Sequence, residues 1–242
     1  VTTIGDGAFS NCKNLETITL TSNANITEVS NYLFNGCDKL TDITIPASVT
    51  KIGEYAFYSC ESLHNITIPE KVTTIGAHAF QGCNSLSSIT INGAVKTIQN
   101  EAFYSCTSLE SITIPESVKT IGEKAFAFSG LTSVTIPNNV TSLGNNTFSR
   151  CYNLNTITIG TGVSSIPNNA FEFCTSLESI TIPSNVETIE DNAFLNCTSL
   201  SSITLNVGLQ QIGNNVIEDC SSLVTITIPS SVTSIKEDAF YH

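Results

Sequence analysis

Several residue types are scarce in this sequence or missing from it. It has no methionine and no tryptophan, and charged residues make up only 12% of its 242 residues. The 9 Lys and Arg residues are outnumbered by 21 Asp and Glu, which gives a net charge of −12. Such a surface cannot neutralise phosphates, so we exclude nucleic acid and anionic membranes as partners. No apolar run approaches the roughly 18 residues that cross a bilayer, so we expect no membrane insertion.

The sequence also lacks the motifs that mark catalytic and metal sites. It contains no H-E-x-x-H, no G-x-S-x-G, no C-x-x-C and no phosphate-binding loop. Its 3 histidines fall at different positions of the repeat described next, so they form no metal-binding column. We therefore predict no catalytic residue, no cofactor and no metal ion. Calcium binding by Asp6, Glu54 or Asp191 is an alternative, although capping of turns also explains acidic residues there.

What the sequence does have is an internal repeat. A phenylalanine returns every 22 to 25 residues, most often every 23, and an isoleucine once takes its place. The column consists of Phe9, Phe34, Phe57, Phe80, Phe103, Phe126, Phe148, Phe171, Phe194, Ile217 and Phe240. The longest step carries two extra residues near 21–25, and the shortest step lacks one near Ser129. The unbroken period predicts a single domain over residues 1–242. Because it begins and ends inside a repeat, we expect a piece of a longer chain.

The repeat unit reads approximately V-x-x-I-G-x-x-A-F-x-x-C-x-S-L-x-x-I-T-I-P. In the I-T-I segment two isoleucines flank a threonine, and this alternation predicts a half-buried strand that the proline ends. The V-x-x-I segment returns two apolar residues to the core. Gly followed by an acidic or amide residue then predicts a short turn of helix that carries Ala, Phe and Cys inward. Stacked at about 4.8 Å, about ten coils would form a core roughly 50 Å long.

This pattern resembles the BspA-like leucine-rich repeats of bacterial and protist surface proteins. Ala-Phe-x-x-Cys and Ile-Thr-Ile-Pro recur in phase, so the resemblance covers the chain from Val1 to Phe240. It implies an α/β repeat solenoid, a right-handed leucine-rich-repeat array of about ten 23-residue coils with a parallel sheet on the concave side. Members are mostly regarded as cell-surface adhesins, which implies an extracellular or cell-surface location. This chain departs from the commoner leucine-rich pattern because no regular asparagine ladder follows the strand.

The cysteines form a second column, three residues after the phenylalanines. They are Cys12, Cys37, Cys60, Cys83, Cys106, Cys151, Cys174, Cys197 and Cys220, and Ser129 replaces the cysteine in the shortest repeat. Neighbours in adjacent coils would have Cβ atoms about 5 Å apart, against roughly 3.8 Å in a disulfide. We therefore predict reduced, buried cysteines that act as small hydrophobic residues. Some disulfides are an alternative, and metal or redox chemistry is a third interpretation.

The outward side chains of the predicted I-T-I strands are mostly hydroxyls. The threonine of I-T-I and the residue two positions before it are expected to face outward in every coil, and we call this surface the hydroxyl face. Its central part is the candidate ligand-binding site: Ser88, Thr90, Ser111, Thr113, Ser133, Thr135, Thr156, Thr158, Ser179 and Thr181. The face could be adhesive, or simply a soluble surface that favours strands. It also resembles the T-x-T ribbons of ice-binding solenoids, but a concave sheet does not match flat ice.

Two further features lie away from the hydroxyl face or modify it. Tyrosines at positions 32, 55, 58, 104 and 152 flank the phenylalanine turn, where packing at the edge of the turn explains them. A lectin that stacks sugars on the strands is therefore not expected. N-x-S/T sequons at positions 25, 65, 139, 145 and 196 would matter only in a secreted eukaryotic protein. A glycan at Asn65 would obstruct the hydroxyl face.

These observations favour a non-catalytic binding or adhesion module at the cell surface. We predict that the hydroxyl face binds a protein or another cell-surface ligand. The alternative is a structural spacer or stalk that displays another domain, which would tolerate changes of surface and of repeat number. Ice binding is a third candidate. We also expect end-to-end self-association through the apolar edges of the first and last coils.

Overall fold

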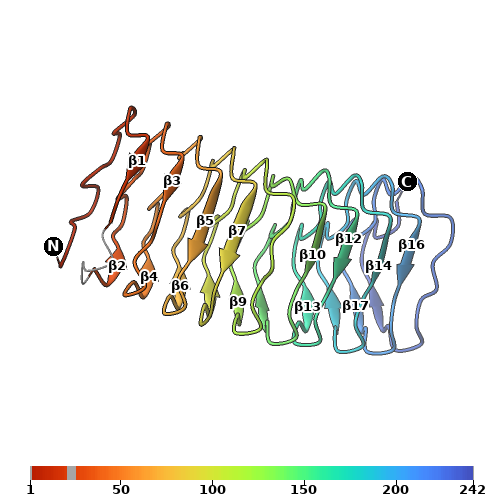
Figure 1. Cartoon of the computed structure of the whole chain (residues 1–242). Helices are drawn as coiled ribbons and strands as arrows, with labels where there is room; N and C mark the ends of the chain where they lie inside the picture. The colour runs from red at the N-terminus through yellow and green to blue at the C-terminus, as the bar shows by residue number, and fades with distance from the viewer. Residues whose placement is uncertain (1, 21–25, 242) are drawn as a thin grey trace.

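Short parallel strands are the only regular secondary structure in the part of the chain that the computed structural model describes, residues 2–20 and 26–241. One row of strands comes from the I-T-I segments: β1 (Thr17–Ile18), β3 (Asp42–Ile43), β5 (Asn65–Ile68), β7 (Ser88–Ile91), β10 (Ser133–Thr135), β12 (Thr156–Thr158), β14 (Ser179–Thr181) and β16 (Ser202–Thr204). A second row comes from the V-x-x-I segments: β2 (Glu28–Val29), β4 (Lys51–Ile52), β6 (Thr74–Ile75), β8 (Thr97–Ile98), β9 (Thr120–Ile121), β11 (Ser142–Leu143), β13 (Ser165–Ile166), β15 (Thr188–Ile189), β17 (Gln211–Ile212) and β18 (Ser234–Ile235). The chain winds from one row to the other and back in each coil (Figure 1).

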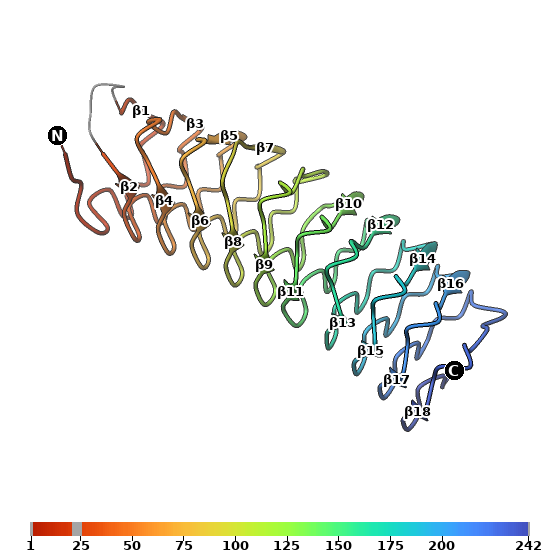
Figure 2. The ribbon, with the colours of Figure 1, turned by 90° about the horizontal axis from the view of Figure 1, so that it is seen from below.

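The coils stack in register along the solenoid. In β10 and β12, for example, Ser133 pairs with Thr156 and Thr135 pairs with Thr158. Figure 2 shows the two rows along opposite edges of the array, with the two termini at opposite ends. The solenoid has about nine turns of about 23 residues, so the ten coils that we expected are not confirmed. The extra residues near 21–25 lie outside the described residues.

The two rows differ in continuity. The second row forms one six-stranded and one four-stranded sheet, which meet between β11 and β13. The residue directly after each second-row strand normally donates its N–H to the preceding coil. The N–H of Gly122 donates to Ile98 O at 2.9 Å, and that of Gly144 donates to Ile121 O at 2.8 Å. The next coil has Pro167, which has no N–H to donate, and this explains the break. The I-T-I row forms only two-stranded pieces, with one additional bridge between Ser111 and Ser133.

The predicted turn of helix around Ala-Phe-x-x-Cys is wrong for the described residues, which contain no helix, and so the α/β label is also wrong. Two residues of each turn, such as Tyr55 (φ 54°) and Ser59 (φ 52°), adopt the left-handed conformation. This conformation turns alternate N–H groups toward the next coil: Phe57 donates to Ala79 O and Ser59 donates to Gln81 O, both at 2.8 Å. A helix would keep these hydrogen bonds within its own segment. The fold is therefore a parallel-strand solenoid whose third side is also hydrogen-bonded between coils.

The core is a set of columns that run the length of the solenoid. Successive phenylalanine rings from Phe9 to Phe194 stack with centroids 5.2 to 5.7 Å apart and planes within 18° of parallel. The rings from Phe34 to Phe194 are fully buried. Burial of each such side chain contributes roughly 1.5–3 kcal/mol, and stacking adds to this. The period predicted these columns correctly.

The cysteine column lies beside the phenylalanines. All nine cysteines are free thiols, and eight are buried as predicted, whereas Cys12 is exposed. Each buried thiol donates a weak hydrogen bond to a phenylalanine carbonyl 25 to 28 residues earlier, as Cys83 does to Phe57 O at 3.1 Å. Loss of hydration on burial raises the pKa of Cys106 to about 12. These thiols are therefore part of the core rather than a reactive site.

Candidate binding surface

The hydroxyl face has the orientation that the sequence predicts. All ten candidate residues from Ser88 to Thr181 are exposed, while Val134 and Ile180 between them point into the core. This follows from the pleat of a strand, which sends alternate side chains to opposite faces. Parallel pairing then places equal side chains side by side, as in Thr135 beside Thr158. The hydroxyls therefore form two columns along the face.

A hollow of about 560 Å³ lies in the middle of this face. Six of the ten candidates line it: Ser111, Thr113, Ser133, Thr135, Thr156 and Thr158. Its floor is made by Ile112, Val134 and Ile157, and Glu116 adds a carboxylate to its lining. The other four candidates, Ser88, Thr90, Ser179 and Thr181, do not line this hollow. The structure thus brings six predicted residues into one central site.

The hydroxyls of these six residues differ from others in the same repeat. Thr50 Oγ1 donates to Thr27 O at 3.0 Å, and Thr73 Oγ1 donates to Thr50 O at 3.3 Å, so this column ties one coil to the previous one. Among the described residues, by contrast, none forms a hydrogen bond with the side-chain hydroxyls that line the hollow. Each of these hydroxyls can therefore donate one hydrogen bond and accept two from water or from a ligand.

A second hollow, of about 320 Å³, lies on the same face nearer the N-terminus. Asp42, Thr44, Asn65 and Thr67 line it together with apolar residues. These residues were not among the predicted site residues. Asp42 and Asn65 could have indicated this hollow from the sequence, because they replace Ser or Thr in the hydroxyl column. Asn65 is exposed there, so a glycan at this sequon would project from the hydroxyl face.

The turn side of the solenoid carries rings that pack on one another. Tyr32 stacks on Tyr55 with centroids 4.9 Å apart, and Tyr55 stacks on His78 at 4.3 Å. The predicted packing of the tyrosines is confirmed here, although Tyr32 is still 43% exposed. Phe128 and Arg150 on the same side were not predicted as site residues. Phe128 belongs to the shortest repeat, and Arg150 belongs to the repeat that follows it.

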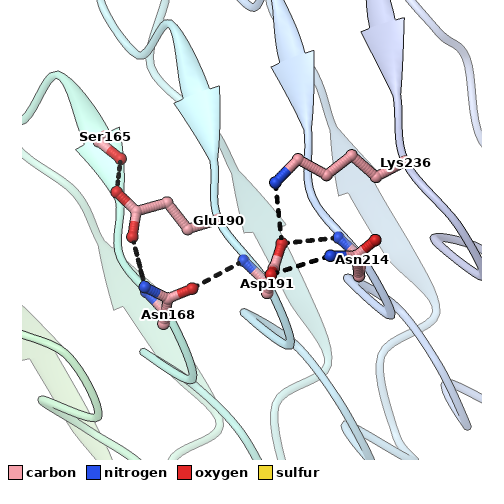
Figure 3. Close-up of polar contacts among 6 residues, drawn as sticks. All are labelled: Ser165, Asn168, Glu190, Asp191, Asn214 and Lys236. Atoms are coloured by element: carbon pink, nitrogen blue, oxygen red, sulfur yellow. Dashed lines mark hydrogen bonds and ion pairs between the residues drawn. The ribbon is translucent and has the colours of Figure 1, made fainter.

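Asp and Asn side chains form a ladder at the start of several turns. Asp191 Oδ1 accepts the backbone N–H of Asn214 at 2.8 Å, and Asn168 Oδ1 accepts that of Asp191 at 3.1 Å (Figure 3). Glu190 Oε2 accepts from Asn168 Nδ2 at 2.8 Å, and Lys236 Nζ lies 3.5 Å from Asp191 Oδ1. No regular asparagine ladder follows the I-T-I strands. Asp and Asn at the start of the turn form a partial counterpart, because their side-chain oxygens accept backbone N–H groups of the next coil.

This ladder accounts for Asp191 without a metal ion. Hydrogen bonds from Asn214, and then the charge of Lys236, lower the pKa of the Asp191 carboxyl. Its two oxygens are already occupied by these partners. Among the described residues, no group of three or more His, Cys, Asp and Glu side chains could hold a metal ion. Calcium binding by Asp191 therefore gains no support.

The repeat matches a family model. The BspA type leucine-rich repeat region matches in six copies over residues 1–107, 27–153 and 119–242, which together span the chain. The chain belongs to the BspA-type leucine-rich repeat family. The resemblance that the sequence suggested is therefore confirmed. No curated protein sequence matches the chain.

Three solved bacterial proteins illustrate the range of this BspA-type fold. A leucine-rich repeat protein of Bacteroides ovatus is 33% identical with a TM-score of 0.73, over 77% of this chain and 49% of that protein. One of Eubacterium ventriosum is 26% identical with a TM-score of 0.61, over 99% and 80%. The T. pallidum leucine-rich repeat protein is 28% identical with a TM-score of 0.53, over 82% and 79%. The chain thus spans about half the length of the Bacteroides ovatus protein.

Membership of this family indicates a general type of protein. Repeats of this family are generally non-enzymatic scaffolds, and leucine-rich repeat domains generally mediate protein interactions. In the part of the chain that the structure describes, no helix is long and apolar enough to cross a membrane.

Proposed function

We propose that residues 1–242 form one non-catalytic binding domain whose hydroxyl face adheres to a protein or another cell-surface ligand. The observation that carries this proposal is the central hollow, where six exposed hydroxyls have no partner within the described chain. Elsewhere in the repeat, comparable hydroxyls are used to join the coils. We place the domain outside the cell or on its surface, as expected for an adhesive module of this family.

The physical character of the face suits contact with a large ligand. Its hydroxyls project from a stacked backbone, so little conformational entropy is lost when they bind. Threonine and serine also have few rotamers to restrict. With few charges on this face, binding would rely on many hydrogen bonds and bridging waters, and would depend little on salt.

The proposal is tested by replacing Thr113, Thr135 and Thr158 together with lysine. Their side chains are exposed, so the change removes no core contact, and adjacent like charges cost about 0.2–1 kcal/mol per pair. We expect a folded protein that has lost binding to a panel of cultured cells and extracellular matrix proteins. Binding of the fluorescently labelled chain to that panel is the measurement, and circular dichroism checks the fold.

A matched control exists on the opposite edge. Thr74, Thr97 and Thr120 occupy three successive coils of the second row and pair in the same way. Replacing these three with lysine adds the same charge at the same spacing, and we expect binding to persist. Their side chains are half-buried, so circular dichroism must show that this variant is folded. Equal binding by both triple variants would reject the hydroxyl face as the ligand site.

The alternative function is a structural spacer. It is favoured by the hydrogen bonds between coils on all three sides of the solenoid, which make it a stiff support. A spacer predicts that the wild-type chain binds nothing in the same panel. It also predicts that an internal 23-residue repeat can be removed without loss of function. Ice binding is not favoured, because a hollow interrupts the face while ice is flat.

A further inference from the structure

A separate hollow of about 350 Å³ lies on the turn side of the solenoid, away from the hydroxyl face. We call it the aromatic hollow. Its lining includes Glu101, Tyr104, Lys124, Phe128, Arg150 and Glu172, which come from four successive coils. Its size falls within the range of small-molecule sites. Nothing in the core columns or in the hydroxyl face requires this combination of side chains.

The backbone at this site is unfavourable for the residues it carries. In each turn the residue before the cysteine position adopts the left-handed conformation, which Gly36 and Gly82 adopt without strain and Asn196 adopts readily. In three successive coils, bulky residues stand there instead: Phe128 (φ 59°), Arg150 (φ 60°) and Phe173 (φ 57°). Side chains held in a costly conformation concentrate at functional sites. The strain therefore suggests that these three side chains are needed at this place.

These side chains form an ordered wall. The guanidinium carbon of Arg150 lies 4.3 Å from the centre of the Phe173 ring and 5.7 Å from that of Phe128, so it is held between the two rings. Glu172 Oε1 lies 3.9 Å from Arg150, and Ser149 Oγ donates to Glu172 Oε2 at 3.0 Å. The Glu172 side chain is only 14% exposed. Both charged groups are thus fixed in place before any ligand arrives.

Two rings provide an apolar surface beside this wall. Tyr104 and Phe128 are only half-buried, and their centroids lie 5.2 Å apart with planes tilted by 53°. Tyr152 meets the Phe128 ring edge-on with centroids 6.4 Å apart, and it is 45% exposed. Apolar ring faces next to fixed hydrogen-bonding groups suit a ligand with one apolar face and a polar edge.

The charges of the hollow balance. Glu101 and Glu172 oppose Lys124 and Arg150, and Gln81 and Asn146 add amides that both donate and accept hydrogen bonds. An anion would meet two carboxylates in a protein of net charge −12, and a cation would meet two basic groups. The best fit is a neutral ligand rich in hydroxyls, since a hydroxyl also donates and accepts.

We propose that the aromatic hollow binds a neutral hexopyranose, the ring unit of a glycan. The C–H face of the sugar ring would lie on Tyr104 and Phe128, and its hydroxyls would bond to the carboxylates, amides and Arg150. This site is independent of the hydroxyl face. The proposal therefore stands or falls separately from the proposed function.

The test is saturation-transfer NMR on the full chain with neutral methyl glycosides of glucose, galactose and mannose. Irradiation of the protein should saturate the ring protons of at least one glycoside. In Phe128→Asn, which gives the position a residue that favours its backbone conformation, the signal should fall about tenfold or more. Tyr32→Ala, which removes an exposed ring on the same side of the solenoid, should leave the signal unchanged.

Stability separates a binding role from a structural one. Asparagine adopts the left-handed conformation more readily than phenylalanine, and this gain offsets the lost contacts of the half-buried ring with Tyr104 and Tyr152. The urea midpoint of Phe128→Asn should therefore change little. If this variant unfolds, the rings are structural and the proposal is wrong. Arg150→Gly is a second variant in which the signal should be lost while circular dichroism shows a folded protein.

Three further results would overturn the proposal. The first is the absence of saturation transfer to every neutral glycoside. The second is a stronger signal from a glucuronide or from glucosamine, which would identify a charged ligand. The third is an unchanged signal in both Phe128→Asn and Arg150→Gly. The triple-lysine variant of the hydroxyl face should retain sugar binding, and this result distinguishes the two sites.

Discussion

At the scale of single residues, the cysteine column shows why one residue type repeats. A thiol is small enough to pack beside the phenylalanine stack, and it can still donate a weak hydrogen bond to a carbonyl of the preceding coil. Ser129, which takes the cysteine position once, is also buried, and its Oγ lies 3.3 Å from Cys151 Sγ. Both residues satisfy the same requirement of a small side chain with a donor.

The buried thiols of Cys106 and Cys151 predict a loss of stability at alkaline pH. Burial raises the pKa of Cys106 and Cys151 from 9.0 to about 12, so the folded protein keeps protons that the unfolded chain releases. The stabilisation is complete below about pH 9 and declines as the pH rises toward 12, by about 1.4 kcal/mol per thiol and pH unit. Urea unfolding in reducing buffer at about pH 8 and about pH 10 measures it.

Cys106→Ser is the matched variant, because the array already accepts serine at this position in Ser129. Between the same two pH values, the free energy of unfolding of this variant should fall by about 1.4 kcal/mol less than that of the wild type. An identical loss in the two proteins would show that Cys106 ionises in the folded state.

At the scale of elements, the sequence predicted the strands of the hydroxyl face and the buried phenylalanine and cysteine columns, but not the strands of the second row or the conformation of the turn. Alternation is a local signal, so it correctly placed Thr135 outward and Val134 inward. The strands of the second row have only two residues, which is too short for any period. The turn around Phe57 resembles a helix start locally, but its N–H groups bond to the next coil. Whether these N–H groups bond within the turn or to the next coil depends on residues about 23 positions away, so no local sequence pattern can predict it.

The candidate site was predictable to the same extent. The sequence identified the hydroxyl columns, because they are periodic. It could not show that six of the ten residues surround one hollow, because this depends on how successive coils are placed on one another. Arg150 and Phe128 were also missed, although each departs from the consensus of its column. Departures from the period were thus the available signal for the aromatic hollow.

The shortened turn makes its own prediction. Gly130 replaces two residues of the usual unit, and a Cβ placed there would lie 2.2 Å from Thr107 O and 3.0 Å from its carbonyl carbon. Gly130→Ala should therefore force the coils apart and lower the free energy of unfolding by about 1–3 kcal/mol. At Gly5, an added Cβ meets no atom within 4 Å. Gly5→Ala should change stability by less than about 0.5 kcal/mol in the same urea experiment. Similar costs at the two sites would contradict this explanation.

At the scale of the whole molecule, each coil is stabilised by its neighbours, so the solenoid is not equally stable along its length. The middle coils are covered on both sides, and their phenylalanines are fully buried. In the last described coil, Val224 is 89% exposed, and Ile228 and Ile235 are also exposed. The I-T-I segment of this coil, residues 226–228, forms no strand.

We therefore expect this end to open first or to associate with another copy. Amide exchange over residues 222–235 should be faster than over β8 and β9 in dilute solution. Sedimentation should show association that grows with concentration and decreases in the double variant Val224→Thr and Ile235→Thr. Equal exchange at the end and in the middle of a monomer would contradict the prediction.

The hydrogen bonds between coils on all three sides also determine how the molecule would respond to force. When the two ends are pulled apart, the coils would unfold one at a time from an end, because each terminal coil is hydrogen-bonded to a single neighbouring coil. Each released coil of about 23 residues would lengthen the molecule by roughly 70–80 Å. A solenoid of this kind would therefore act as an extensible tether that yields in nearly equal steps, while the coils not yet released stay folded.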